Sequence, residues 1–171
     1  MAGPIARIGF GGGCHWCTEA VFKSLKGVAA VAQGYVSPLA DPSSFSEGVI
    51  VNYYSDCVKL ATLIEIHLIT HKSSEQHSMR DKYRSAIYTF EDPKHTEVLE
   101  TLKNVKKRLG IEVITKVLEF GEFTASREEI TDYYYKNPSK PFCRKFIDPK
   151  LKTLLKTHQK HLKIDQLNHL F

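Results

Sequence analysis

Two cysteines that follow a run of glycines near the N-terminus are the strongest candidates for chemistry in this chain. Three glycines at positions 11–13 lead directly into Cys14, and Cys17 follows in a Cys-x-x-Cys pair that contains the only tryptophan, Trp16. Consecutive glycines allow a sharp backbone turn and leave space beside the sulfur for a substrate. A thiol in the first turn of the following helix meets unpaired N–H groups, which favour the reactive thiolate. We therefore predict that Cys14 is a nucleophile.

Two other kinds of site fit this stretch less well. A dinucleotide-binding turn needs Gly-x-Gly-x-x-Gly, but in the run that starts at Gly9 the last glycine is replaced by Cys14. A zinc site needs a second ligand pair, and no second Cys-x-x-Cys is present. His67 and His71 share a helix face, but no His-Glu-x-x-His pattern surrounds them. We predict no metal and no bound cofactor.

Two further cysteines lie later in the chain. In a reducing compartment such thiols are more often catalytic or metal-binding than structural. Cys57 follows a predicted strand end, and we interpret it as a bystander. Cys143 ends the stretch KNPSKPFC, where Pro138 and Pro141 argue against regular structure. We therefore expect Cys143 on a mobile loop.

Alternating strands and helices must position these residues. Hydrophobic periodicity predicts strands at 6–12, 28–36, 47–54, 83–90 and 112–120, and helices at 14–26, 58–72, 92–109 and 127–135. This order is typical of an α+β protein, a two-layer sandwich with a mixed sheet and a ferredoxin-like core. We predict a single domain over 1–171, with an irregular segment at 137–148 and a basic C-terminal helix at 149–163.

Composition places the chain among ordinary globular proteins. Its 171 residues are 42% hydrophobic and 25% charged, which is enough to bury a core. No apolar run approaches the ~18 residues of a membrane span, and the N-terminus has no apolar signal region, so we expect a cytoplasmic protein without membrane contact. The net charge of +5 arises from late lysines that do not alternate with aromatic residues. This pattern indicates a solvated helix face rather than a nucleic-acid site, and we expect a monomer.

Four blocks of the sequence resemble the A-type peptide methionine sulfoxide reductase family, and they occur in the family's order. The blocks are GFGGGCHWCTEAVFKSLKGV, SEGVIVNYY, KYRSAIY and FTASREEITDYYYKNPSKPFC. They resemble the family's Gly-Cys-Phe-Trp segment, its acidic-residue strand, its Gln-Tyr-Arg-Ser-Ala-Ile-Tyr segment and its late Lys-Asn-Pro-x-x-Tyr-Cys segment. The resemblance implies that family's fold and the reduction of methionine-S-sulfoxide, free or in proteins, to methionine.

The resemblance also implies roles for individual residues. Cys14 matches the catalytic cysteine, while His15 and Trp16 stand where the family has the Phe-Trp wall that holds the S-methyl group. Glu47 matches the acid that protonates the sulfoxide oxygen, and Tyr83 matches the tyrosine that hydrogen-bonds this oxygen. Glu47 must begin the reaction protonated, which apolar surroundings would favour.

A second thiol is needed to complete the cycle that the resemblance implies. Cys14 becomes a sulfenic acid, which condenses with another cysteine to a disulfide that thioredoxin or another dithiol reduces. Cys143 matches the family's recycling cysteine. Cys17, one helical turn from Cys14, is the alternative resolving thiol, and the sequence leaves this choice open.

The sequence departs from the family pattern around the expected oxygen-binding groups. The loop between the second and third strands is short and offers only Phe45 where the family has a second tyrosine. Ser78 stands at the position of an aspartate, with Asp81 nearby but out of register, and His15 replaces a phenylalanine. Two other functions stay open: a general Cys-x-x-Cys thiol–disulfide oxidoreductase, and a non-catalytic module that binds methionine or its sulfoxide.

Overall fold

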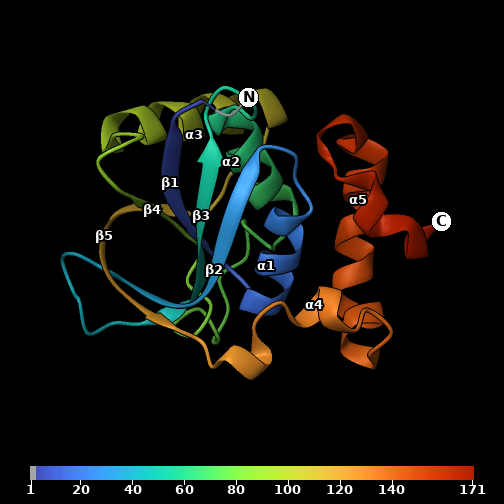
Figure 1. The fold of residues 1–171 in the computed structure, drawn as a ribbon. Coiled ribbons are helices and arrows are strands. Elements are labelled where there is room, and N and C mark those ends of the chain that lie inside the picture. The colour runs from blue at the N-terminus through green and yellow to red at the C-terminus, as the bar shows by residue number, and fades with distance from the viewer. Residues whose placement is uncertain (1–2) are drawn as a thin grey trace.

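Five strands form a small closed barrel, with helices packed on one side (Figure 1). The computed structural model describes residues 3–171. The strands are β1 (Ile5–Gly11), β2 (Val28–Pro38), β3 (Ser46–Tyr54), β4 (Ala86–Thr89) and β5 (Lys116–Ala125). They run around the barrel in the order β1-β3-β2-β5-β4, and β4 closes it by pairing with β1. Only β4 and β5 are parallel, so the sheet is mixed.

The α+β class and the mixed sheet are as predicted, but an open two-layer, ferredoxin-like sandwich does not describe this arrangement. The sheet closes because Phe10 in β1 pairs with Ile87 in β4, and Tyr88 in β4 pairs with Leu118 in β5. Strand twist accumulates across a sheet and can bring its two edges together. Hydrophobic periodicity identifies the strands but carries no information on whether the edges meet.

In Figure 1 the helices lie to the right of the strands and above them. They are α1 (His15–Lys23), α2 (Leu60–Ile69), α3 (His95–Leu109), α4 (Tyr133–Lys136) and α5 (Asp148–Thr157). The C-terminal segment, with α4 and α5, lies beyond α1 (Figure 1). No helix in the part of the chain described here combines the length and apolar character needed to span a bilayer.

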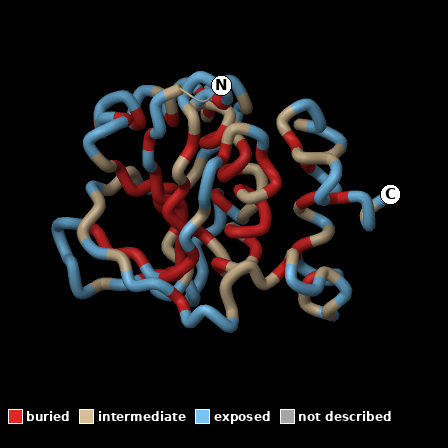
Figure 2. The backbone as a smooth tube through the Cα atoms, in the orientation of Figure 1, coloured by how far each residue is buried: buried red, intermediate tan, exposed pale blue. Residues whose placement is uncertain are grey.

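Two hydrophobic cores sit on opposite faces of the sheet, and Figure 2 shows the buried backbone concentrated in the strands and in α1 and α2. Inside the barrel, Tyr88 packs with Val36 and Ile50. The larger core lies between the barrel and the helices, where Phe10 stacks on Phe22 with ring centroids 4.5 Å apart. This stack anchors α1 to β1 and so holds the glycine turn that joins them.

The segment predicted to be irregular at 137–148 is helical in its second half. A π-helical turn covers Cys143–Ile147 and continues into α5. Pro141 begins the helical region, and Pro149 lies in the first turn of α5. Pro141 is tolerated because it stands in the first turn of the helical region, where its missing N–H would have no partner, and Pro149 directly follows the π-helical turn. The predicted basic helix ends at Thr157, earlier than expected, and 3₁₀ turns follow.

Candidate active site

Cys14 occupies the N-cap of α1, at the end of the glycine turn. A side chain at Gly12 would lie 2.4 Å from the His71 ring, whereas a side chain at Gly13 would meet nothing within 4 Å. Gly12 therefore allows close packing with His71, which lies just beyond the C-terminus of α2, and Gly13 leaves open space beside Cys14. Both consequences match the reason for predicting a nucleophile at this position.

Hydrogen bonds favour the thiolate of Cys14. The Cys17 thiol donates to the Cys14 sulfur and lowers the pKa of Cys14 below its ordinary value; burial opposes this shift, and the Trp16 backbone N–H supports it. The same contact raises the pKa of Cys17 far above its ordinary value, so Cys17 stays a thiol. One cysteine is thus prepared to attack while its neighbour acts as a donor.

A cavity of about 350 Å³ opens beside Cys14. Its apolar walls come from Met79, Phe142 and Phe146, and its polar groups include Tyr83, His71 and Lys150. Burial lowers the pKa of His71 to about 4, so that imidazole is neutral near pH 7. The cavity can therefore receive a short apolar side chain with one polar atom, as methionine sulfoxide has.

Tyr83 lines this cavity, as its predicted role requires, although it does not belong to a strand. The predicted strand 83–90 begins only at Ala86. Arg80, which the sequence reasoning missed, explains the irregular backbone: its guanidinium donates to the carbonyls of Gly12 (2.8 Å) and Tyr83 (2.9 Å) and to that of Lys72. These bonds tie the segment that carries Tyr83 to the glycine turn.

Glu47 is buried in β3, but its surroundings are not the apolar ones expected. Its Oε1 accepts a hydrogen bond from the backbone N–H of His15 at 3.2 Å and lies 3.4 Å from His15 Nε2. Its Oε2 lies 3.5 Å from the ammonium group of Lys82. The carboxyl group thus touches the backbone of the residue next to Cys14, although Glu47 does not line the 350 Å³ cavity.

His15 and Trp16 do not line the cavity beside Cys14, so the structure does not place them as the expected methyl-binding wall there. The His15 ring is buried against β2, where its Nδ1 lies 2.8 Å from the Gly34 carbonyl oxygen. One face of Trp16 stacks on Tyr133 at a centroid distance of 4.0 Å, and Phe142 meets it edge-on. The apolar wall comes instead from Met79 and from Phe142 and Phe146, on either side of Cys143, and the helix pattern alone did not place that last segment near Cys14.

The other thiols occupy different environments. Cys143 is fully buried, its sulfur donates to the Asn137 carbonyl at 3.7 Å, and burial raises the pKa of its thiol. Cys143 packs in the same core cluster as Cys14 and Cys17, whereas Cys57 is exposed. All four cysteines are reduced in this structure.

Three residues that were noted where the sequence departs from the family pattern lie outside the site. Lys150, which the sequence did not indicate, is part of it. Phe45, Ser78 and Asp81 are exposed and do not line the cavity. Lys150 from α5 lines the cavity and donates to the Thr70 carbonyl. Burial lowers the pKa of Lys150, while Cys17 and Cys14 oppose that shift. No sequence signal connects Lys150 with Cys14, because 136 positions separate them (150 − 14).

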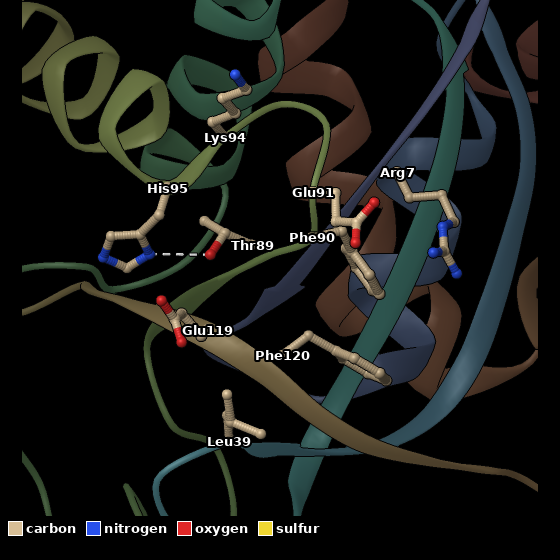
Figure 3. A pocket seen from close by; sticks show the side chains of 9 residues that line it. All are labelled: Arg7, Leu39, Thr89, Phe90, Glu91, Lys94, His95, Glu119 and Phe120. Atoms are coloured by element: carbon tan, nitrogen blue, oxygen red, sulfur yellow. Dashed lines mark hydrogen bonds between the residues drawn. The ribbon is translucent and has the colours of Figure 1, made fainter.

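A second cavity, of about 660 Å³, is lined by different residues from β1, β4, β5 and the segments next to them (Figure 3). Its walls carry both signs of charge, and Figure 3 shows Arg7 and Glu91 near Phe90. None of its lining residues is a cysteine. Within residues 3–171, no three His, Cys, Asp or Glu side chains converge as ligands for a metal ion.

These features define a class of protein: an α+β thiol-dependent oxidoreductase, in which one activated cysteine opens on a substrate cavity and further thiols lie close by. Comparison with known proteins identifies the particular family. Residues 6–163 match the family model described as peptide methionine sulfoxide reductase. The chain belongs to this family, and the enzyme class expected from the sequence is confirmed.

Individual relatives are similar in sequence to this protein along about 90% of its chain. The peptide methionine sulfoxide reductase MsrA of Saccharolobus solfataricus is 31% identical over 170 residues, covering 91% of this chain and 96% of the relative. That of Psychrobacter sp. is 29% identical over 167 residues, covering 89% and 95%. Methionine sulfoxide reductase A of Corynebacterium diphtheriae shares the fold, with a TM-score of 0.67 at 22% identity over 80% of this chain and 76% of that one. Mxr1 of Saccharomyces cerevisiae in its reduced form also has a TM-score of 0.67, at 20% identity over 84% and 92%.

Proposed function

We propose that this protein reduces methionine-S-sulfoxide, free or within proteins, with Cys14 as the nucleophile. The observation that carries the proposal is the position of Cys14: its thiolate is favoured by the Cys17 thiol, and it opens on a cavity with apolar walls and the Tyr83 side chain. The thioether end of the substrate fits against Met79 and Phe146, because sulfur and aromatic rings pack favourably. Tyr83 supplies a hydroxyl group for the sulfoxide oxygen.

The first step transfers oxygen from one sulfur to the other. The Cys14 thiolate attacks the sulfoxide sulfur, and Glu47 supplies the one proton that the oxygen requires. Attack forms a sulfur–sulfur bond. The protonated oxygen then passes to the Cys14 sulfur as its bond to the substrate sulfur breaks, the sulfur–sulfur bond breaks, methionine leaves with an electron pair on its sulfur, and Cys14 becomes a sulfenic acid. The thiolate is thereby oxidised by two electrons, and the sulfoxide is reduced by two.

The second step converts the sulfenic acid into a disulfide. We propose that Cys143 condenses with the sulfenic acid of Cys14, releasing water and leaving a disulfide. Phe142, the neighbour of Cys143, already lines the Cys14 cavity, and this supports the pairing. Cys17 stays the alternative, because its thiol touches Cys14. Against it, two cysteines three residues apart in a helical turn meet the geometry of a disulfide only with strain.

A dithiol of the thioredoxin type is the proposed reductant of this disulfide. Mxr1 of Saccharomyces cerevisiae, in complex with Trx2, shares the fold with a TM-score of 0.55 at 18% identity over 75% of this chain and 87% of that one. A buried disulfide needs a partner that can enter the cavity and attack one sulfur. The structure holds no partner, and we propose no bound cofactor.

The contact between Cys14 and Cys17 favours one second candidate function, a general thiol–disulfide oxidoreductase. One assay separates the two functions. Reduction of N-acetyl-methionine sulfoxide and of the disulfides of insulin is measured with dithiothreitol as the reductant, and the rate without the enzyme is subtracted. We expect turnover with the sulfoxide only. Turnover with insulin alone would establish the second candidate and reject the first.

A further inference from the structure

A buried imidazole adjoins the carboxyl group that is proposed to protonate the substrate. His15 is the first residue of α1, and its side chain is 4% exposed, compared with 7% for that of Glu47. The proposed reaction does not use His15, and its ring does not line the cavity. Its position at the acid therefore needs an explanation of its own.

The contacts of the ring determine which nitrogen faces the carboxyl group. His15 Nδ1 lies 2.8 Å from the carbonyl oxygen of Gly34, which can only accept a hydrogen bond. Nδ1 therefore carries a hydrogen, and Nε2 is the nitrogen whose protonation can change. Nε2 lies 3.4 Å from Glu47 Oε1. Catalytic contacts of this length tighten when a substrate binds.

Other groups hold the Glu47 carboxyl group in this position. The backbone N–H of His15 donates to the same Oε1 at 3.2 Å, and Lys82 lies at Oε2. The backbone N–H of Glu47 also donates to the Lys82 carbonyl at 2.9 Å. Besides Glu47 and Lys82, the ionisable group that faces the His15 ring is the Tyr35 phenol on β2, edge-on at a centroid distance of 5.3 Å.

We propose that His15 and Glu47 share one exchangeable proton between Nε2 and Oε1, and that His15 returns a proton to Glu47 after each transfer to the sulfoxide oxygen. The inference rests on the proposed function and makes His15 a positioning residue that acts through Glu47. In the transfer, Glu47 loses its proton to the departing oxygen. Nε2, which then carries no proton, takes up one from water, and this proton is shared with Oε1 again. The net result is one proton from solvent for each sulfoxide reduced.

The shared proton has a consequence for the pH dependence of the first step. An isolated carboxyl group loses its proton near pH ~4.3, whereas a carboxyl–imidazole pair keeps one proton up to at least pH ~6.5, the ordinary range of imidazole. Between about pH 5.5 and about pH 7.5 the protonated form of the isolated group falls roughly 100-fold, and that of the pair roughly tenfold or less.

The test is single-turnover formation of the Cys14 sulfenic acid from N-acetyl-methionine-S-sulfoxide in the wild type and in H15F, across this pH range. Dividing the rate of the variant by that of the wild type at each pH cancels the titration of the Cys14 thiolate. We expect this ratio to fall about tenfold or more from pH 5.5 to 7.5. H95F, which alters a histidine at the distant 660 Å³ cavity, serves as the matched control, with a ratio near one at every pH.

Three further measurements make the result decisive. The H15Q side chain can still donate a hydrogen bond to the Gly34 carbonyl, but it does not titrate. The ratio of its rate to that of the wild type should therefore fall with pH as for H15F. If H15F does not fold, H15Q alone decides the question. In an E47Q background, H15F should cause no further change, because the proton acceptor is gone. A rate ratio that does not change with pH would overturn the inference. The same holds if H15F has as large an effect in the E47Q background as in the wild type. Failure of the wild type itself to reduce the sulfoxide would reject the proposed function instead.

Discussion

At the scale of single residues, this site separates two thiols that stand three positions apart. Cys17 donates a hydrogen bond to Cys14, so the pKa of Cys14 falls and that of Cys17 rises. We propose that this Cys-x-x-Cys pair supplies both the nucleophile and its hydrogen-bond donor. The identity of the attacking sulfur follows from position: only Cys14 is at the N-cap, beside the open space at Gly13.

We expect Cys14→Ser to abolish sulfoxide reduction even with dithiothreitol as the reductant, because a serine hydroxyl group is not ionised near neutral pH. The assay is the formation of N-acetyl-methionine from N-acetyl-methionine sulfoxide. Cys57→Ser, which alters an exposed cysteine away from the cavity, is the control and should keep full activity. Turnover in Cys14→Ser would move the nucleophile to another residue.

Loss of the Cys17 donor should make Cys14 less reactive near neutral pH. In Cys17→Ala the largest contribution that lowers the pKa of Cys14 is removed, so its thiolate should appear only at higher pH. The measurement is the rate at which iodoacetamide alkylates the peptide that contains Cys14, followed by mass spectrometry against pH. An unchanged or lower midpoint in Cys17→Ala would contradict the assigned hydrogen bond.

Substitution of the proposed acid tests the protonation step. Glu47→Gln should slow the first step by roughly 100- to 10,000-fold, the usual worth of general acid–base catalysis, with little change in substrate binding. Single-turnover kinetics with the substrate concentration varied separate these two effects. If the maximal rate were unaltered, another group would have to protonate the oxygen.

At the scale of elements, the choice of the resolving thiol depends on the segment that leads into α5. Cys143 lies in the π-helical turn Cys143–Ile147 and donates to the Asn137 carbonyl. To reach Cys14, it must give up this bond and move with Phe142, which packs on Trp16. Cys17 needs a distortion of the first turn of α1 instead. Each pairing therefore requires one helical element to deform.

The disulfide can be mapped directly. The reduced enzyme is treated with one equivalent of methionine sulfoxide, digested and analysed by mass spectrometry. We expect a Cys14–Cys143 crosslink and loss of thioredoxin-dependent turnover in Cys143→Ser. A dominant Cys14–Cys17 crosslink, with turnover intact in Cys143→Ser, would make the Cys-x-x-Cys pair the recycling unit.

At the scale of the whole molecule, the cavity is built from parts that are far apart in the chain. The glycine turn supplies the nucleophile, the segment before β4 supplies Met79 and Tyr83, and the C-terminal region supplies Phe142, Phe146 and Lys150. A sulfoxide sulfur is chiral, and walls fixed on three sides accept one arrangement of methyl group, oxygen and chain.

We expect the enzyme to consume the S epimer at sulfur and to leave the R epimer, because the two epimers are reduced by separate enzymes. Each pure epimer of N-acetyl-methionine sulfoxide is incubated with the enzyme and dithiothreitol, and the remaining sulfoxide is measured by chiral chromatography. Consumption of the R epimer alone would contradict the assignment.

Local sequence determined the features that depend on neighbouring residues. The glycine turn, the helix that follows it and the position of Cys14 at that junction are set by backbone freedom and periodicity within about twenty residues. The family resemblance also drew attention to Tyr83, which lines the cavity; its role toward the sulfoxide oxygen stays a prediction. Tertiary structure decided the remaining features, because they depend on contacts between residues that are far apart in the chain. Closure of the barrel through β4, the burial of His15 against Glu47, and the arrival of Phe142 and Lys150 beside Cys14 all depend on how elements pack. Periodicity shows that a face is buried, but it does not show which partner buries it.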